Sequence, residues 1–185
     1  MPKKRETKRR NEKIKGKRTP GIRTFEIEEG IGMTEAEAQE FLAESTCVLK
    51  LGTVDAKGDP YVHPVWYLFE QSVAKLYIFT EKQSKKLQNI KKRPRVYFDV
   101  DDVVWPYKGV KGKGFAREVT GKKETVTLVD KILTKYIKSR NHTNFTGHLN
   151  GARKGVYSVI EITPTYFSTW DYGKLASKYR DMTLK

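Results

Sequence analysis

The sequence predicts a mainly β domain with flanking helices, an α+β fold. Runs rich in β-branched and aromatic residues, such as Leu76 to Phe79 and Arg95 to Val100, are typical of half-buried strands. A capping box over Thr34 to Glu37 and apolar residues at helical spacing over Thr125 to Lys138 predict two helices. No apolar run approaches the roughly 20 residues that span a bilayer, so we expect a cytoplasmic protein without a membrane partner.

The positive charge of the chain is concentrated at its N-terminus. Residues 1–23 hold eleven lysine and arginine residues and two glutamates, a net charge of +9 out of +15. A segment so charged and so poor in apolar residues cannot bury enough surface to fold. We therefore expect a disordered basic arm over residues 1–23 and one folded domain over residues 24–185. Weak nucleic-acid contact is one expected role of the arm, and a solvated tail is the alternative.

The middle of the chain indicates a meander of strands. Residues 47–54, 61–69 and 75–80 read as three strands, with a turn over residues 55–60. Cys47, the single cysteine, lies among apolar residues and is expected in the core of a protein from a reducing compartment. Pro64 inside the second strand is tolerated only at a sheet edge or a bulge, and a bulge facing a ligand would suit it. Residues 110–119 and 156–170 predict further strands.

The stretch from Leu76 to Phe98 predicts a strand, a short helix and a second strand. Ser84 is a good N-cap for the helix, and the first N–H groups of a helix attract anions because they have no intrahelical acceptor. Lys85 and Lys86 add positive charge in the first turn, and Thr80 ends the preceding strand. These residues predict a phosphate site. The alternative is a solvated lysine face.

These residues also resemble a known family. Phe79-Thr80, Ser84-Lys85-Lys86, Asn89-Ile90 and Pro94-Arg95-Val96 are similar to the FMN-phosphate segment of the pyridoxamine 5'-phosphate oxidase-like proteins, the flavin-binding split β-barrels. The resemblance extends over roughly Thr34 to Arg180. It implies a six-stranded antiparallel split β-barrel of the FMN-binding type, and a homodimer with the flavin at the interface between subunits. It also implies that Thr80, Lys85 and Lys86 contact the flavin phosphate and ribityl chain.

The resemblance assigns further residues to the cofactor and the substrate. The remaining flavin positions are His63, Pro64, Val65, Trp66, Phe79, Ser84, Trp170 and Arg180. Tyr136 and Arg140 match two positions that hold a substrate phosphate, although a tyrosine and an arginine at the end of any amphipathic helix would look alike. For Trp66 the alternative is that the alternation of a strand makes its side chain buried or half-exposed, without any contact to a ligand. His142 and His148 lack a carboxylate or cysteine at ligand spacing, so no metal is expected.

The implied function is that of an FMN-dependent oxidoreductase, which transfers a hydride between FMN and a small organic substrate or a nicotinamide. His63 and Leu68 stand where the family's enzymes carry basic residues, and residues 176–178 lack the arginine and histidine that bind the vitamer. A different substrate is therefore expected. No nucleophile, carboxylate pair or metal cluster points to a catalytic residue. The alternatives are a deazaflavin-dependent reductase on the same fold and a non-catalytic flavin-binding or nucleic-acid-binding protein.

Overall fold

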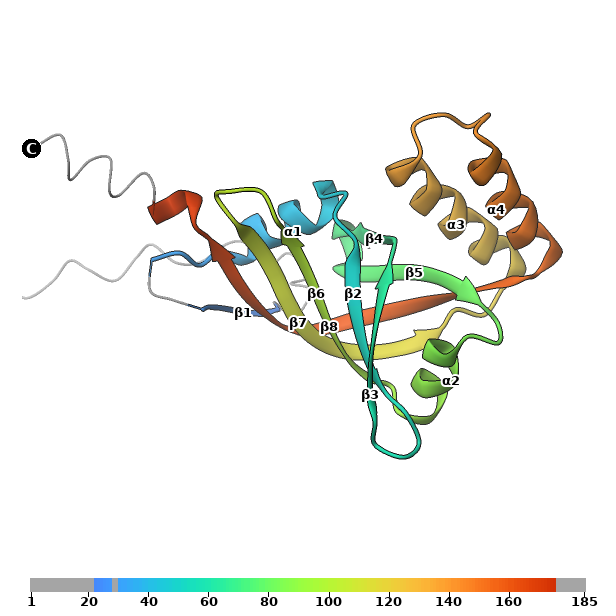
Figure 1. Ribbon diagram of the computed structural model, residues 1–185, viewed down its shortest axis with the longest axis horizontal. Helices are drawn as coiled ribbons and strands as arrows, with labels where there is room; N and C mark the ends of the chain where they lie inside the picture. Colours follow the sequence, from blue (N-terminus) through green and yellow to red (C-terminus); the bar gives the residue numbers. More distant parts are fainter. Residues whose placement is uncertain (1–21, 28–29, 176–185) are drawn as a thin grey trace, which may run out of the picture.

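In the part of the chain that the structure describes, eight strands form one sheet that curls into a half-barrel, with helices packed around it (Figure 1). This computed structural model describes residues 22–27 and 30–175. Most of the predicted basic arm and Arg180 therefore lie outside the described residues. Ile22 is buried and Arg23 begins the first strand, so these two residues of the predicted arm belong to the described fold.

The order of strands across the sheet is β3-β2-β6-β7-β8-β5-β4, and β1 pairs with β8 in parallel. The strands are β1 (Arg23–Glu26), β2 (Leu49–Val54), β3 (Pro60–Val65), β4 (Tyr67–Glu70), β5 (Lys75–Glu81), β6 (Arg95–Asp102), β7 (Lys108–Glu118) and β8 (Tyr157–Asp171). The prediction of six antiparallel strands is therefore wrong in the number of strands and in the direction of β1. No strand was predicted at β1, because only one of its four residues is partly buried and the segment shows no alternation of apolar and polar residues.

The predicted strand over residues 61–69 is divided at Trp66. Its first half, β3, pairs with β2, and its second half, β4, pairs with β5. These two halves are the opposite edges of the sheet, so the split of the barrel lies between segments that are consecutive in sequence. Pro64 lies on the edge strand β3, opposite Lys50 and in unbroken register, which confirms the edge and excludes the bulge.

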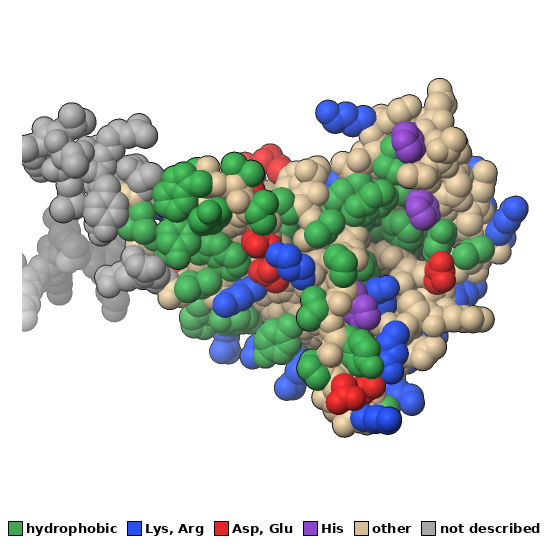
Figure 2. All heavy atoms as spheres, viewed as in Figure 1, with side chains coloured by type: hydrophobic (Ala, Val, Ile, Leu, Met, Phe, Trp, Pro, Cys, Tyr) green, Lys and Arg blue, Asp and Glu red, His purple; other side chains and the backbone are tan. Residues whose placement is uncertain are grey.

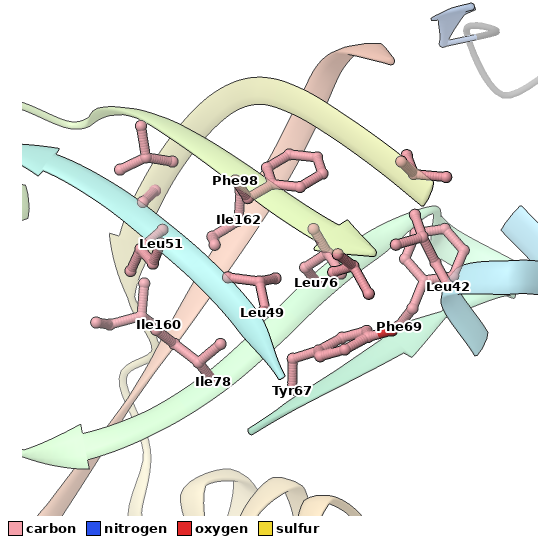
Figure 3. Packing of buried hydrophobic residues seen from close by; sticks show 14 of the residues in the cluster. Leu42, Leu49, Leu51, Tyr67, Phe69, Leu76, Ile78, Phe98, Ile160 and Ile162 are labelled. Atoms are coloured by element: carbon pink, nitrogen blue, oxygen red, sulfur yellow. The ribbon is translucent and has the colours of Figure 1, made fainter. Parts of the chain in front are cut away.

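Apolar side chains from alternate strand positions fill the inside of the curled sheet (Figure 3). The labelled members of this core are Leu42, Leu49, Leu51, Tyr67, Phe69, Leu76, Ile78, Phe98, Ile160 and Ile162. A second apolar cluster lies on the other face of β5 and β8, where Tyr77 and Val159 pack against helices α3 (Lys122–Tyr136) and α4 (Thr143–Lys154). Successive strand residues point to opposite faces, which is why β5 contributes to both clusters.

Helices α1 (Glu35–Glu44), α2 (Lys85–Lys92) and α3 were expected from their sequence patterns, and α4 was not. The α4 segment contains Gly147 and Gly151, which lower helix propensity. Its buried residues Phe145, Leu149 and Ala152 nevertheless recur at helical spacing. A short 3₁₀ turn, η1 (Gln71–Val73), joins β4 to β5. None of the helices in the described part of the chain has the length and apolar character that a membrane crossing requires.

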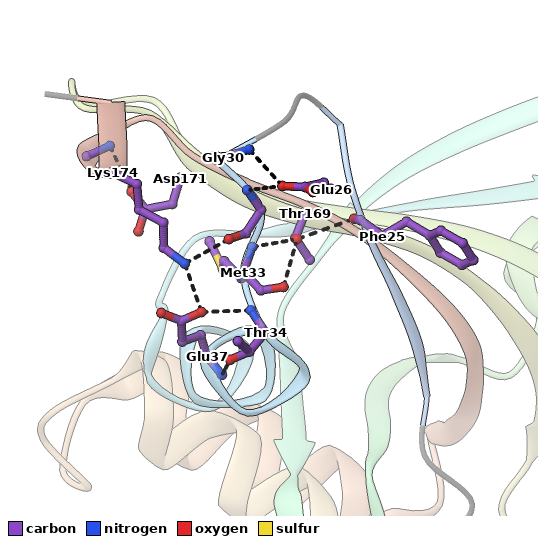
Figure 4. Close-up of polar contacts among 11 residues, drawn as sticks. Phe25, Glu26, Gly30, Met33, Thr34, Glu37, Thr169, Asp171 and Lys174 are labelled. Atoms are coloured by element: carbon purple, nitrogen blue, oxygen red, sulfur yellow. Dashed lines mark hydrogen bonds and ion pairs between the residues drawn. The ribbon is translucent and has the colours of Figure 1, made fainter. Parts of the chain in front are cut away.

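A buried threonine ties the start of the domain to its last strand (Figure 4). Thr169 Oγ1 accepts a hydrogen bond from Met33 N at 2.8 Å. The predicted capping box of α1 is present, with Glu37 N donating to Thr34 Oγ1 at 3.2 Å and Thr34 N donating to Glu37 Oε2 at 2.7 Å. Lys174 Nζ lies 2.9 Å from Glu37 Oε2, so the end of the described chain is fixed to the first turn of α1.

Candidate functional site

The end of β5 and the start of α2 meet at one corner of the sheet. Lys86 Nζ donates a hydrogen bond to Thr80 Oγ1 at 3.1 Å. Ser84 is the N-cap of α2, and its hydroxyl accepts from Leu87 N at 3.4 Å. The structure therefore brings Thr80, Ser84 and Lys86 together at a helix start, where the amides of the first turn lack intrahelical acceptors. We call these three residues the phosphate corner, after the ligand that the sequence predicts there.

The electrostatics of this corner favour an anion. Burial lowers the pKa of Lys86, and the charge of Glu81 opposes that shift. A partly desolvated ammonium beside the positive end of a helix is unfavourable, and a bound anion offsets both effects. The donors at the corner are an ammonium, a threonine hydroxyl and backbone N–H groups, which is the donor set that a phosphate group accepts.

Lys85 has a different partner. Its Nζ lies 3.1 Å from Asp55 Oδ2 and 4.9 Å from the centroid of the Tyr61 ring. The hydrogen bond that Lys85 donates to the Asp55 carboxylate raises the pKa of Lys85, so the ammonium stays charged. An acidic side chain is therefore present near the corner, but it binds Lys85 and does not cap α2, which Ser84 caps. A phosphate here would share Lys85 with Asp55.

His63 on β3 is linked to α2 through two buried polar side chains. His63 Nε2 lies 3.3 Å from Thr53 Oγ1, which accepts a hydrogen bond from Asn89 Nδ2 at 3.0 Å. Thr53 is 2% exposed and Asn89 is 3% exposed. Burial lowers the pKa of His63, and the nearby charge of Lys86 lowers it further. Three elements, β3, β2 and α2, are thus joined beside the phosphate corner.

Sequence reasoning missed Thr53, Asn89 and Asp55. Thr53 follows Leu49 and Leu51 in strand alternation, so a polar residue at a buried position was the available signal. Asn89 is buried on α2 beside Ile90. It is therefore a second polar residue in an apolar environment. Buried polar groups require partners, and here each of the two is the partner of the other.

The other residues that were predicted to contact the flavin lie on different surfaces of the sheet. Val65 packs against the barrel core. Trp66 belongs to the second cluster, where its ring stacks on Tyr136 with centroids 5.1 Å apart. Phe79 also belongs to the second cluster, because it precedes Thr80 in β5 and points to the opposite face. The structure brings His63 to the phosphate corner and directs Trp66 and Phe79 toward α3 and α4.

Tyr136 and Arg140 have separate partners within the chain. The Tyr136 hydroxyl donates to Cys47 O at 3.1 Å and accepts from Tyr67 N at 3.3 Å. Burial raises the pKa of Tyr136 to about 12, so the hydroxyl stays protonated. Arg140 makes two hydrogen bonds to the Asp130 carboxylate, at 2.9 and 2.8 Å. These contacts do not bring the two predicted substrate residues to one point.

Trp170 lies near the far end of β8 from the phosphate corner. Thr80 pairs with Ser158, and Trp170 follows twelve residues later on the same strand (170 − 158). At about 3.3 Å per residue this is roughly 40 Å of strand. The Trp170 ring lies across Gly109, where a Cβ atom would come within 2.8 Å of indole Cε2. Within one chain, Thr80 and Trp170 therefore belong to different ends of the sheet.

Comparison with known proteins agrees with this architecture. The family model described as pyridoxamine 5'-phosphate oxidase matches residues 34–171. A comparison with curated protein sequences gave no significant match. Among the described residues, no group of three or more histidine, cysteine, aspartate or glutamate side chains is placed to hold a metal ion.

Three solved structures illustrate the likeness. A conserved hypothetical protein from Mycobacterium tuberculosis is 22% identical, with a TM-score of 0.68 over 80% of this chain and 91% of the other. An F420 reductase is 25% identical, with a TM-score of 0.57 over 70% and 94%. A FAD-binding protein from Mesorhizobium loti is 22% identical, with a TM-score of 0.54 over 73% and 92%. With its curled sheet, its helix α2 and a family match over most of its length, the chain belongs to the pyridoxamine 5'-phosphate oxidase family.

Proposed function

We propose that this protein binds FMN and acts as an oxidoreductase that transfers a hydride between FMN and a small organic substrate or a nicotinamide. The observation that carries the proposal is the contact between Lys86 and Thr80 at the start of α2. When bound, FMN supplies the redox chemistry at its ring. The chain contributes phosphate binding through Lys86, Thr80 and the first-turn amides, and it contributes ring placement from the adjacent strand β3.

The proposal includes a homodimer with the flavin at the interface. Thr80 and Trp170 cannot both contact one flavin within a single chain, because they lie toward opposite ends of β8. A second copy related by a two-fold axis can supply Trp170 to the first copy's phosphate corner. The outer face of the sheet is a candidate contact between the two copies, since it exposes Val62 (71%), Tyr97 (58%) and Phe115 (50%).

These three apolar residues share one face of the sheet. Val62 pairs with Gly52, and Gly52 pairs with Tyr97, so Val62 and Tyr97 lie on the same side. Phe115 pairs with Arg95, which is two residues from Tyr97 and therefore on that side too. Figure 2 shows further hydrophobic side chains gathered at the end of the sheet where β6 meets β7. Val104 and Trp105, in that turn, are 68% and 62% exposed.

A deazaflavin-dependent reductase is the second candidate. The F420 reductase that matches at 25% identity favours it, because a deazaflavin coenzyme would present a phosphate to the same corner. A non-catalytic flavin-binding protein on this fold is the remaining alternative. The three functions differ in the cofactor that is bound and in whether the bound cofactor is reduced.

Reconstitution of the purified protein separates these functions. The protein is incubated with FMN, or with a deazaflavin coenzyme in a parallel sample, and freed of unbound cofactor by gel filtration. NADH or NADPH is then added without oxygen. We expect FMN to remain bound and its visible absorbance to fall as it is reduced. Retention of the deazaflavin alone would favour the reductase. Retention of FMN that neither nicotinamide reduces would exclude a nicotinamide as the hydride donor and leave an organic substrate or a non-catalytic binder.

A further inference from the structure

Three polar residues beside the phosphate corner, His63, Thr53 and Asn89, form a chain in which the direction of the His63–Thr53 hydrogen bond depends on the histidine tautomer. Asn89 donates from Nδ2 to Thr53 Oγ1 at 3.0 Å, so this threonine oxygen already accepts one hydrogen bond. The oxygen could accept a second hydrogen bond, but the hydroxyl also has one proton, and because Thr53 is buried that proton needs an acceptor. Within the described chain, His63 Nε2, at 3.3 Å, is the acceptor that the structure provides for it.

A histidine that accepts at Nε2 is neutral and carries its proton on Nδ1. The surroundings of His63 favour the neutral ring, because burial and the charge of Lys86 both lower its pKa. The other charged groups at this corner are Lys85 with its partner Asp55, and Glu81 beside Lys86. The carboxylate of Asp55 is committed to Lys85 and to the backbone amides of residues 57 and 59.

We propose that Asn89 and Thr53 fix His63 as a neutral imidazole with its proton on Nδ1, and that His63 donates this proton in a hydrogen bond to an acceptor oxygen of the ligand bound beside Lys86. Thr53 and Asn89 are then positioning residues, and His63 is a ligand-binding residue. The second half of this proposal rests on the proposed function, since it takes FMN as the ligand. The first half concerns the protein without a ligand.

The location of His63 supports its role toward a ligand. It is half-buried on the inner side of the edge strand β3, the strand that borders the split of the barrel. The Tyr61 ring, two residues earlier, lies parallel to it with centroids 6.2 Å apart. In an imidazole the two nitrogens lie on different edges of the ring, so bonding Nε2 to Thr53 leaves the Nδ1 edge for another partner.

The tautomer can be measured directly. The chain has only three histidines, and long-range ¹H–¹⁵N spectra distinguish a ring protonated on Nδ1 from one protonated on Nε2. The spectra are recorded about two units above the ordinary histidine pKa of about 6.5, where the rings are neutral. His63→Gln identifies the His63 signals. His142 is an internal control, because its Nδ1 accepts from Asn144 N at 3.2 Å and its proton must therefore be on Nε2.

We expect His63 to show the Nδ1–H tautomer and His142 to show the Nε2–H tautomer. Thr53→Val removes the hydroxyl at nearly constant volume and should return His63 toward the Nε2–H form, whereas Thr53→Ser should keep Nδ1–H. An Nε2–H ring at His63 in the unchanged protein would overturn the proposal. That spectrum decides the matter even if Thr53→Val does not fold.

Addition of FMN then tests the ligand half. We expect the His63 Nδ1 signal to shift on FMN binding, and His63→Phe to weaken that binding by up to about tenfold, which is the contribution of one neutral hydrogen bond. If FMN binds and this signal stays in place, His63 is not the donor. If FMN does not bind the unchanged protein, the proposed function fails together with the ligand half, and the tautomer spectrum still decides the first half.

Discussion

Lys86 and Thr80 are joined by a hydrogen bond of 3.1 Å from the lysine Nζ to the threonine hydroxyl. The contact connects the first turn of α2 to the end of β5, six positions earlier in the chain. It holds the lysine ammonium near the N-terminus of α2, which is the positive end of the helix dipole. We propose a phosphate group as the occupant of this corner, and most of the proposals above depend on it.

The buried carboxylate of Glu161 is expected to stabilise the fold in a pH-dependent way. Its oxygens accept hydrogen bonds from Arg117 Nε at 2.8 Å, Lys75 Nζ at 3.0 Å and the Tyr77 hydroxyl at 3.3 Å. Burial alone would raise the pKa of Glu161, but the hydrogen bonds from Arg117 and Lys75 outweigh it and leave the pKa below 4.5. The stabilisation is therefore present above about pH 4.5 and is lost as the pH falls through the lower, folded-state pKa.

Glu161→Gln tests this expectation. The substitution should lower the free energy of unfolding at neutral pH by about 1–3 kcal/mol and make the loss of stability in acid shallower. Denaturant unfolding at several pH values gives both quantities. Glu70→Gln breaks the more exposed ion pair with Lys131, at 2.9 Å, and should change stability by less than about 1 kcal/mol. Equal effects of the two substitutions would argue against a special role for Glu161.

Tyr136 and Arg140 should differ in their effects on stability. The Tyr136 hydroxyl joins two backbone groups, so Tyr136→Phe should lower the free energy of unfolding by about 1 kcal/mol. Arg140→Gln removes an ion pair in which the arginine side chain is 62% exposed, and should have little effect. Thermal unfolding of the two variants provides the comparison. A large loss from Arg140→Gln would mean that its pair with Asp130 holds the end of α3 in place.

The outer face of the sheet is expected to be the dimer interface. Tyr97→Glu places a charge at the centre of that face and should convert the dimer to a monomer, because burying a carboxylate in an interface costs desolvation that its cross-strand neighbour Lys113 does not fully offset. Light scattering after gel filtration measures the mass. Val73→Glu changes an exposed apolar residue of η1 and should leave the dimer intact. A monomeric unchanged protein, or a dimeric Tyr97→Glu variant, would contradict this interface.

The basic arm is expected to act independently of the flavin. Because Ile22 is buried and β1 begins at Arg23, the deletion should remove residues 1–21 only. The shortened protein should keep its yellow colour with FMN and lose any salt-dependent binding to nucleic acid. A salt titration with a fluorescent oligonucleotide measures this binding. Loss of FMN together with the arm would show that the arm belongs to the folded domain.

Local patterns were sufficient to predict much of the fold. Ser84 caps α2, and Thr34 with Glu37 forms the capping box, since each depends on residues within one turn of the helix. The division at Trp66 was not predictable in this way, because it depends on which strands become the sheet edges. The same is true of β1, whose partner β8 lies more than one hundred residues later.

The candidate site shows the same limit. Thr80, Ser84 and Lys86 fall within seven consecutive residues, so their grouping could be predicted from the spacing alone. Thr53 and Asn89 are 36 residues apart and are joined only by the packing of α2 against β2. The position of Trp170 relative to this corner depends on the length and path of β8, and on a second chain if the protein is a dimer.

The most direct test of the phosphate corner is the affinity for FMN of three proteins, measured by quenching of flavin fluorescence. They are the unchanged chain, Lys86→Gln, and Lys92→Gln as a control in the exposed last turn of the same helix. One charge-assisted hydrogen bond contributes about 1.5–3 kcal/mol, so we expect Lys86→Gln to weaken FMN binding by roughly 10- to 150-fold. Lys92→Gln should bind FMN as the unchanged protein does. Equal affinity of all three proteins, or no binding by the unchanged chain, would contradict the proposed site.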